Sequence, residues 1–247
     1  MITVVYGFLI GVFVSLIGGG GASLYLGILT SQLHIPVPVA APTSLLIALP
    51  ALGFGFLTQM KIKNVRFNLG NRMIFAAIPG IIGGTLIARW IPLNVYNWVV
   101  GLIFLAMGIM IMVKFFRHGQ KKDARSTNSS RLQAAGFGLL SGLMVGIGGL
   151  SGGATTVGGL TLLGLSSLEA TGTSTYVLFA MSAVGFISHL FTSTFAWTAG
   201  LGLMAGAIAG SIVTPLVLHR MDYQRVNTVL TPFLGILIIY FGISMIA

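Results

Sequence analysis

The sequence lacks cysteine altogether and contains only three acidic residues among its 247 residues. Without cysteine, neither a disulfide nor a thiolate metal site can form. The acids Asp123, Glu169 and Asp222 all lie in polar joints between apolar segments, so no segment contains a pair of carboxylates. A catalytic acid–base pair, a metal site and an aspartate proton relay inside a membrane are therefore not expected, and neither is a cofactor.

Charge of either sign is scarce, because charged residues make up 6% of the chain and hydrophobic residues make up 55%. Soluble domains carry about 25% charged residues. The mean hydropathy is +1.00, and apolar segments approaching membrane-spanning length follow one another along the sequence. We therefore predict an all-α polytopic protein of the cytoplasmic (inner) membrane, with the lipid bilayer around it.

The net charge of +10 comes from thirteen lysines and arginines, all in the short polar joints. Basic residues in short loops beside membrane spans indicate the cytoplasmic side, and they also attract anionic lipid. This placement argues against a nucleic-acid partner.

Five apolar segments precede the polar stretch Lys121–Ser130, and five follow it. The first five are Thr3–Ile17, Ala22–Leu33, Thr43–Gln59, Arg72–Trp90 and Asn94–Phe116. The second five are Leu132–Ile147, Ala154–Leu165, Thr173–Leu190, Ala199–Leu218 and Arg225–Ile246. The first segment lacks a basic region before it and has an internal counterpart, so we expect it to be retained and not cleaved as a signal peptide. This pattern predicts a first transmembrane repeat over residues 1–117, a cytoplasmic linker over 118–131 and a second repeat over 132–247.

Three motifs recur in the same order in the two halves. The glycine run IGGGGAS at Ile17–Ser23 has an imperfect copy, IGGLSGGAT, at Ile147–Thr155. A Thr-Ser pair opens the third segment of each half, and a glycine-rich motif lies in each fourth segment. Glycine and alanine also recur in membrane helices for close packing, but several matches in one order favour a duplication.

Five is an odd number of segments, so the two halves should have opposite orientations. When the Lys61–Arg72 loop is placed in the cytoplasm, the Lys114–Arg131 linker and the Arg220–Arg225 turn fall there too, and only Arg89 is external. Both termini are then external. Charge and spacing together predict two inverted-topology repeats.

The second segment of each half is too short to span a membrane comfortably. Ala22–Leu33 and Ala154–Leu165 have 12 residues each, or roughly 18 Å of helix, against a hydrocarbon core about 30 Å thick. Each half therefore begins either with a hairpin that enters and returns or with short spans around a thinned centre. In both cases the glycine runs approach each other near the midplane.

These motifs resemble the TauE/SafE family of sulfite exporters over nearly the whole chain, from Gly7 to Ile246. The matching elements are Gly18–Gly21, Gly148–Gly153, Thr43-Ser44, Thr173-Ser174, Pro79-Gly80 and Gly83-Gly84. The resemblance implies a membrane transporter of sulfite, sulfonates or related small anions.

The glycine runs are the first candidate binding site, because glycine lets backbone amides approach a ligand and helix N-termini bind anions. The backbone donors would come from Gly19, Gly20, Gly21 and Ala22 on one side and from Gly152, Gly153 and Ala154 on the other. Ser23, Ser151 and Thr155 would add hydroxyl donors. The alternative is that these glycines serve only tight turns and packing.

The Thr-Ser pairs and one histidine complete the candidates. Thr43 and Ser44 follow Pro42 and are expected at a helix start, with Thr173 and Ser174 at the matching place. Their hydroxyls would either reach the substrate or cap and pack helices. His189 lies inside a predicted span, where it would carry protons, contact the anion or form an interfacial hydrogen bond.

The sequence thus predicts a secondary transporter of small oxyanions, not an enzyme, that exports its substrate by rocking one half against the other around a midplane site. The resemblance implies a ligand of the sulfite or sulfonate class, and a homodimer is compatible with the sequence. A passive anion channel and a non-transporting scaffold subunit remain as alternatives.

Overall fold

The computed structural model describes residues 2–17, 21–116, 127–150, 152–190, 193–218 and 223–246. Within these ranges the chain forms ten α-helices and no strands, which confirms an all-helical architecture. The helices are α1 (Ile2–Ile17), α2 (Gly21–Ser31), α3 (Val37–Lys61), α4 (Phe67–Ala88), α5 (Leu93–Phe116), α6 (Thr127–Gly148), α7 (Gly153–Leu162), α8 (Ser167–Leu190), α9 (Trp197–Leu218) and α10 (Tyr223–Ile246). Each of the ten expected apolar segments corresponds to one helix.

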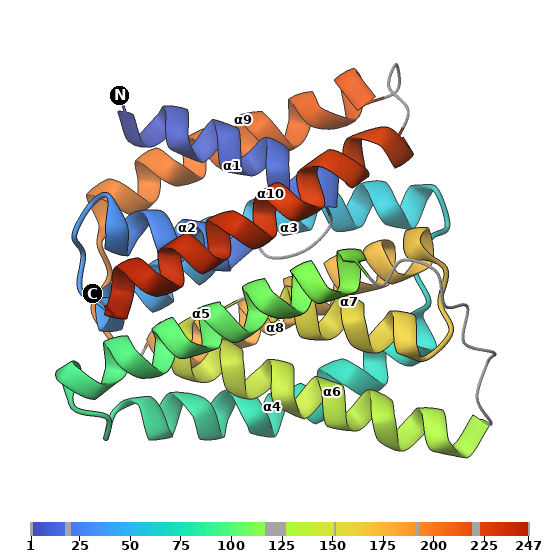
Figure 1. Ribbon diagram of the computed structural model, residues 1–247, viewed down its shortest axis with the longest axis horizontal. Coiled ribbons are helices and arrows are strands. Elements are labelled where there is room, and N and C mark those ends of the chain that lie inside the picture. The colour runs from blue at the N-terminus through green and yellow to red at the C-terminus, as the bar shows by residue number, and fades with distance from the viewer. Residues whose placement is uncertain are drawn as a thin grey trace.

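The first helix of each half packs on the fourth helix of the other half (Figure 1). In the α1–α9 pair, a Cβ built on Gly7 would lie 2.1 Å from the carbonyl oxygen of Leu203. Conversely, a Cβ on Gly206 would lie 2.0 Å from the carbonyl oxygen of Val4. Glycines on both sides let the two backbones touch, as small residues do at helix seams in membranes.

The α4–α6 pair is built in the same way. A Cβ on Gly142 would lie 2.3 Å from the carbonyl oxygen of Ala77, and one on Gly80 would lie 2.6 Å from that of Leu139. The fifth helices pack on each other, with Gly101 of α5 against Gly242 of α10. Each of these seams therefore joins one half of the chain to the other.

The third helices, α3 and α8, pack on each other between the α1–α9 pair and the α4–α6 pair. Much of each is buried, and α3 also contacts α9 while α8 contacts α4. Among the described residues, α3, α4, α5 and α8 are each long and apolar enough to cross a membrane.

The expectation that the Thr-Ser pairs stand at helix starts is wrong. Thr43 and Ser44 lie in the second turn of α3, which begins at Val37, and Thr173 and Ser174 lie at the same depth in α8. In α3 the proline suited to a first turn is Pro38, the second helical residue after the cap residue Pro36, whereas Pro42 lies inside the helix.

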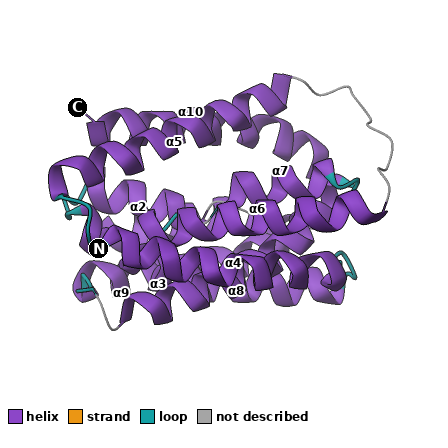
Figure 2. Cartoon of the chain, turned by 90° about the horizontal axis from the view of Figure 1, so that it is seen from below, coloured by secondary structure: helices purple, strands orange, loops and turns teal. Residues whose placement is uncertain are grey.

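The second helices are short and begin partway along the molecule. Both views show α2 toward the end where α1 begins and α10 ends, and α7 toward the opposite end (Figures 1 and 2). α2 has 11 residues and α7 has 10, so neither covers a full membrane thickness. Their first residues face the middle of the bundle from opposite directions.

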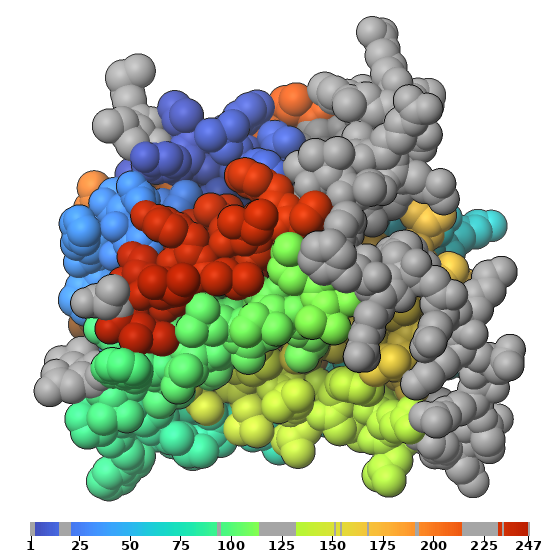
Figure 3. Space-filling model, in the orientation of Figure 1, coloured from blue at the N-terminus to red at the C-terminus, as the bar shows by residue number. Residues whose placement is uncertain are grey.

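The outer surface is apolar. On the face shown in Figure 3, α10 lies beside α5 with α1 and α6 to either side. Large hydrophobic side chains are exposed on these helices, among them Leu102, Ile109, Ile236 and Ile243. Such a surface suits contact with lipid chains.

Candidate functional site

The start of α2 is enclosed by protein on all sides. Every residue from Gly21 to Leu29 is buried, including Ala22 and Ser23. The first turn of a helix leaves backbone N–H groups without intrahelical partners, and the helix dipole makes that end positive. Gly21 therefore starts a buried helix whose positive end lies in the protein interior. Gly19 and Gly20 lie outside the described residues.

The start of α7 depends on glycine conformations that other residues rarely adopt. Gly152, the cap residue, has φ of 57°, and Gly149 has φ of 62°. A Cβ on Gly149 would also lie 2.3 Å from the carbonyl oxygen of Ala41 in α3. Glycine is thus required for the approach of this loop to α3. Gly153 begins the helix, Gly152 and Gly153 are both buried, and Ser151 lies outside the described residues.

Ser44 ties this loop to the other half of the chain. Its Oγ donates to the carbonyl oxygens of Ala41, at 2.7 Å, and Gly149, at 3.1 Å. The hydroxyl of Tyr96 donates to the carbonyl oxygen of Ile147, just before the same loop. Side chains of the first half therefore set the position of the second glycine run.

A cluster of buried hydroxyls lies beside the start of α7. Thr155 Oγ1 is 2.7 Å from Ser141 Oγ in α6 and donates to the carbonyl oxygen of Gly152 at 2.7 Å. Thr156 Oγ1 donates to Ser141 Oγ at 3.1 Å. Sequence reasoning selected Thr155 but missed Ser141 and Thr156, although a serine in an apolar helix just before a glycine run is a readable signal.

The threonines of the two Thr-Ser pairs have matching partners. Thr43 Oγ1 accepts a hydrogen bond from the backbone N–H of Ala196, the residue before α9, at 3.1 Å. The same hydroxyl donates to the carbonyl oxygen of Val39 at 2.6 Å. Thr173 Oγ1 accepts the backbone N–H of Arg66, the residue before α4, at 2.9 Å. We call these contacts the Thr43–Ala196 joint and the Thr173–Arg66 joint. Ser174 Oγ donates to the carbonyl oxygen of Thr171 at 2.9 Å.

His189 is buried between helices near the end of α8. Its Nε2 is 3.1 Å from the carbonyl oxygen of Gly146 in α6, and its Nδ1 is 3.2 Å from Ser193 Oγ. Because a carbonyl oxygen only accepts, Nε2 carries a proton in this arrangement. The ring therefore links α6 to the segment that leads into α9.

Among the described residues, three buried hydroxyls have no hydrogen-bond partner: those of Tyr25, Thr85 and Ser182. Tyr25 is the most notable, since its side chain is fully buried on α2, one turn after Gly21. An unpaired buried hydroxyl costs about 1–3 kcal/mol. Sequence reasoning did not select these residues, because nothing in an apolar helix shows which hydroxyl will lack a partner.

No Asp, Glu, Lys or Arg is buried within the part of the chain that the structure describes. The same residues contain no group of three side chains suited to hold a metal ion. The buried polar atoms near the starts of α2 and α7 are backbone amides and hydroxyls. Such groups hold an anion by hydrogen bonds alone, as helix N-termini do.

The family model described as "Sulfite exporter TauE/SafE" matches residues 3–245 of the chain. The chain belongs to the TauE/SafE family. Membership identifies a membrane transporter, and the apolar helices agree with a multi-pass membrane protein. The expected class, a transporter and not an enzyme, agrees with this family.

Curated relatives carry the same general description. The chain is 28% identical over 225 residues to probable membrane transporter protein YdhB of Bacillus subtilis, covering 88% of this chain and 91% of the relative. It is 25% identical to probable membrane transporter protein YunE of the same organism, covering 98% of each chain. Probable membrane transporter protein MJ0441 of Methanocaldococcus jannaschii is 25% identical over 93% of this chain and 86% of its own length. No solved structure matches the chain.

Proposed function

We propose that this protein is a secondary transporter that exports small oxyanions of the sulfite or sulfonate class by alternating access around a site at the middle of the bundle. The family description, which names a sulfite exporter, supports sulfite as the substrate and export as the direction. The observation that carries the proposal is the pair of short helices, α2 and α7, which begin inside the bundle from opposite ends (Figure 1). Broken helices with interior N-termini are typical of anion sites in transporters.

The binding groups in this proposal come from both glycine runs. Backbone amides of Gly19, Gly20, Gly21 and Ala22 would face those of Gly152 and Gly153, with hydroxyls from Ser23, Ser151 and Thr155. The pairs Thr43-Ser44 and Thr173-Ser174 would border this site. The described hydrogen bonds of Thr43, Ser44 and Thr173 tie them to neighbouring backbone. Direct contact with the anion would therefore require those bonds to be exchanged.

Inverted-topology repeats are the architecture that we propose for the two halves. Reciprocal packing supports it, because α1 packs on α9 as α6 packs on α4. The Thr43–Ala196 and Thr173–Arg66 joints are likewise equivalent under exchange of the halves. With the basic loops in the cytoplasm, both termini would be external. Coupling to protons through His189 is the corresponding proposal for the driving force.

The test is flux of sulfite into liposomes that contain the purified protein, alongside sulfate, sulfoacetate, taurine and thiosulfate under imposed pH gradients. We expect saturable flux that accelerates when substrate is present on the opposite face. Flux without this acceleration would indicate the passive channel. The absence of flux for every oxysulfur anion would overturn the proposed substrate class and favour the scaffold.

The site itself is tested with two alanine variants on the short helices. Gly21→Ala places a methyl 2.9 Å from the side chain of Val14 at the start of α2, whereas a Cβ on Gly158 in α7 has no atom within 4 Å. We expect Gly21→Ala to weaken binding and Gly158→Ala to transport like the unmodified protein. Equal behaviour of the two variants would place the substrate elsewhere.

A further inference from the structure

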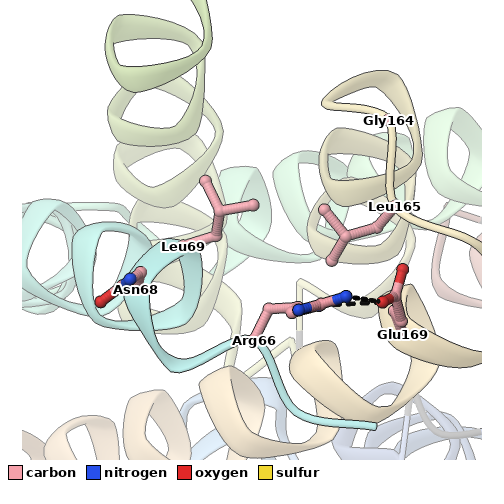
Figure 4. A pocket seen from close by; sticks show the side chains of 6 residues that line it. All are labelled: Arg66, Asn68, Leu69, Gly164, Leu165 and Glu169. Carbon is pink, nitrogen blue, oxygen red and sulfur yellow. Dashed lines mark hydrogen bonds and ion pairs between the residues drawn. The ribbon is translucent and has the colours of Figure 1, made fainter. Parts of the chain in front are cut away.

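An ion pair joins the two halves at the end of the molecule opposite the chain termini. Arg66 is the cap residue before α4, and Glu169 lies in the first turn of α8. The guanidinium donates from Nε to Oε1 of Glu169 at 2.8 Å, and its Nη2 also donates to Oε1 (Figure 4). Among the described residues, this is the only ion pair.

Glu169 is held in place independently of Arg66. Its Oε2 accepts from the backbone N–H of Ser166 at 3.2 Å and from Ser166 Oγ at 3.0 Å. The backbone N–H of Glu169 in turn donates to Ser166 Oγ at 3.4 Å. This is a capping box, in which the residue at the third helical position can be Glu or Gln. The carboxylate is therefore the fixed partner.

Arg66 is the partner that can move. Its side chain is 63% exposed, against 27% for Glu169. Two of its five N–H donors go to one carboxylate oxygen, which leaves three for another acceptor. An exposed ion pair of this kind is weak, so the guanidinium can exchange its acceptor at little cost.

A cavity of about 330 Å³ lies beside the pair. It is lined by Arg66, Asn68, Leu69, Gly164, Leu165 and Glu169. Leu69 and Leu165 face each other above the ion pair (Figure 4). A small molecule that enters from this end thus meets one guanidinium, that of Arg66, paired with the carboxylate of Glu169.

The surrounding charge favours anions. Lys61, Lys63 and Arg72 are exposed on the same loop and the adjoining turn of α4. A patch of one sign raises the local concentration of small ions of the other sign. At the opposite end the equivalent joint has Ala196 in place of Arg66, so a guanidinium stands at only one of the two joints.

We propose that Arg66 is a binding residue at the mouth of the transport path, where its guanidinium exchanges Glu169 for the incoming oxyanion. This inference rests on the proposed function. The planar fork of arginine matches carboxylate and oxyanion alike, so Glu169 acts as an internal competitor for the same donors. Removal of each partner should then have opposite effects on substrate affinity.

The experiment measures sulfite uptake from this face in liposomes containing Arg66→Gln, Glu169→Gln or the unmodified protein. Orientation is assigned by labelling Ile62→Cys, which is exposed at the end of α3 and does not line the cavity, with an impermeant maleimide before sulfite is added, since the chain has no other cysteine. We expect Arg66→Gln to raise KM about tenfold. Glu169→Gln keeps the capping box and should lower KM about two- to fivefold. Arg89→Gln, at the other end of α4 and outside both the cavity and the basic patch, should change KM little.

A purely structural ion pair would give a different result. Both variants would then lose thermal stability together, and KM would stay unchanged or shift in one direction for both. That outcome, with sulfite flux intact in the unmodified protein, overturns the role of Arg66 and leaves the proposed function standing. The absence of sulfite flux in the unmodified protein overturns the proposed function itself.

Discussion

The hydroxyl oxygen of Thr173 in α8 accepts a hydrogen bond from the backbone N–H of Arg66 at 2.9 Å and so fixes the start of α4. The hydroxyl of Thr43 in α3 does the same for Ala196 before α9, at 3.1 Å. We expect Thr43→Val and Thr173→Val each to lower the free energy of unfolding by about 1–2 kcal/mol, because an N–H loses its acceptor. Thermal unfolding in detergent measures this. Thr→Ser variants keep the hydroxyl and should retain most of the stability; equal losses in Ser and Val variants would contradict the assignment.

The same joints offer two matched cross-links. A Cβ on Gly200 would lie 3.1 Å from Cγ2 of Thr43, and one on Gly70 would lie 3.5 Å from Cγ2 of Thr173. The double variants Thr43→Cys/Gly200→Cys and Thr173→Cys/Gly70→Cys therefore place two thiols within reach of a disulfide. If alternating access opens these joints, each oxidised double variant should lose flux and recover it on reduction. The four single-cysteine variants are the controls, and full flux in both oxidised proteins would mean that neither joint opens.

Replacing a glycine at a contact between two helices should reduce stability strongly, whereas replacing a glycine that has open space around it should not. Gly206→Ala would bring a methyl to 2.0 Å from the carbonyl oxygen of Val4, and that backbone atom cannot turn away. We expect a loss of at least about 2 kcal/mol. Gly83 lies in α4 with no atom within 4 Å of a built Cβ. Gly83→Ala should therefore leave stability unchanged or raise it by up to about 1 kcal/mol, as circular dichroism during heating would show.

Removing the unpaired hydroxyl of Tyr25 tests whether this hydroxyl binds the substrate or only stabilises the fold. Tyr25→Phe removes a buried donor that has no partner, so stability should stay equal or rise. Weaker sulfite binding in this stable variant would place the hydroxyl at the substrate. Tyr96→Phe is the matched comparison, because it removes a hydroxyl that donates to Ile147 and should cost about 1 kcal/mol. A loss of stability in Tyr25→Phe would contradict the prediction.

His189 gives a direct test of proton coupling. Its ring contacts Gly146 and Ser193, so His189→Gln can preserve hydrogen bonds while removing the titratable ring. If the histidine carries the coupled proton, the variant should bind sulfite but lose the response of flux to an imposed pH gradient. An unchanged response would assign His189 a purely structural role.

Helix number and order could be read from the sequence, because the apolar segments are separated by short polar, glycine-containing or proline-containing joints. Segment starts were less accurate where prolines follow each other closely: Pro36 and Pro38 lie at the start of α3, while Pro42 lies inside it. A proline shows that a first turn is favourable, but it does not show which of several prolines occupies that turn.

The candidate site was only partly readable. The glycine runs predicted the broken helices, since a run of glycines is costly inside a continuous helix. By contrast, Ser141 and Thr156 join Thr155 only because α6 and α7 pack side by side. The Arg66–Glu169 pair likewise joins residues 103 positions apart, and single-sequence patterns contain no information about such contacts.

The glycine contacts between helices also determine which helices can move together as rigid bodies. The backbones of α1 and α9 are in contact, and so are those of α4 and α6. If the helices of one pair slid past each other, backbone carbonyl groups would collide, because no flexible side chains lie between them. Each seam unites helices from different halves of the sequence. The mechanical bodies of a transport cycle are therefore expected to be these two cross-half pairs, shifting against the α3–α8 pair between them, and not the two halves themselves.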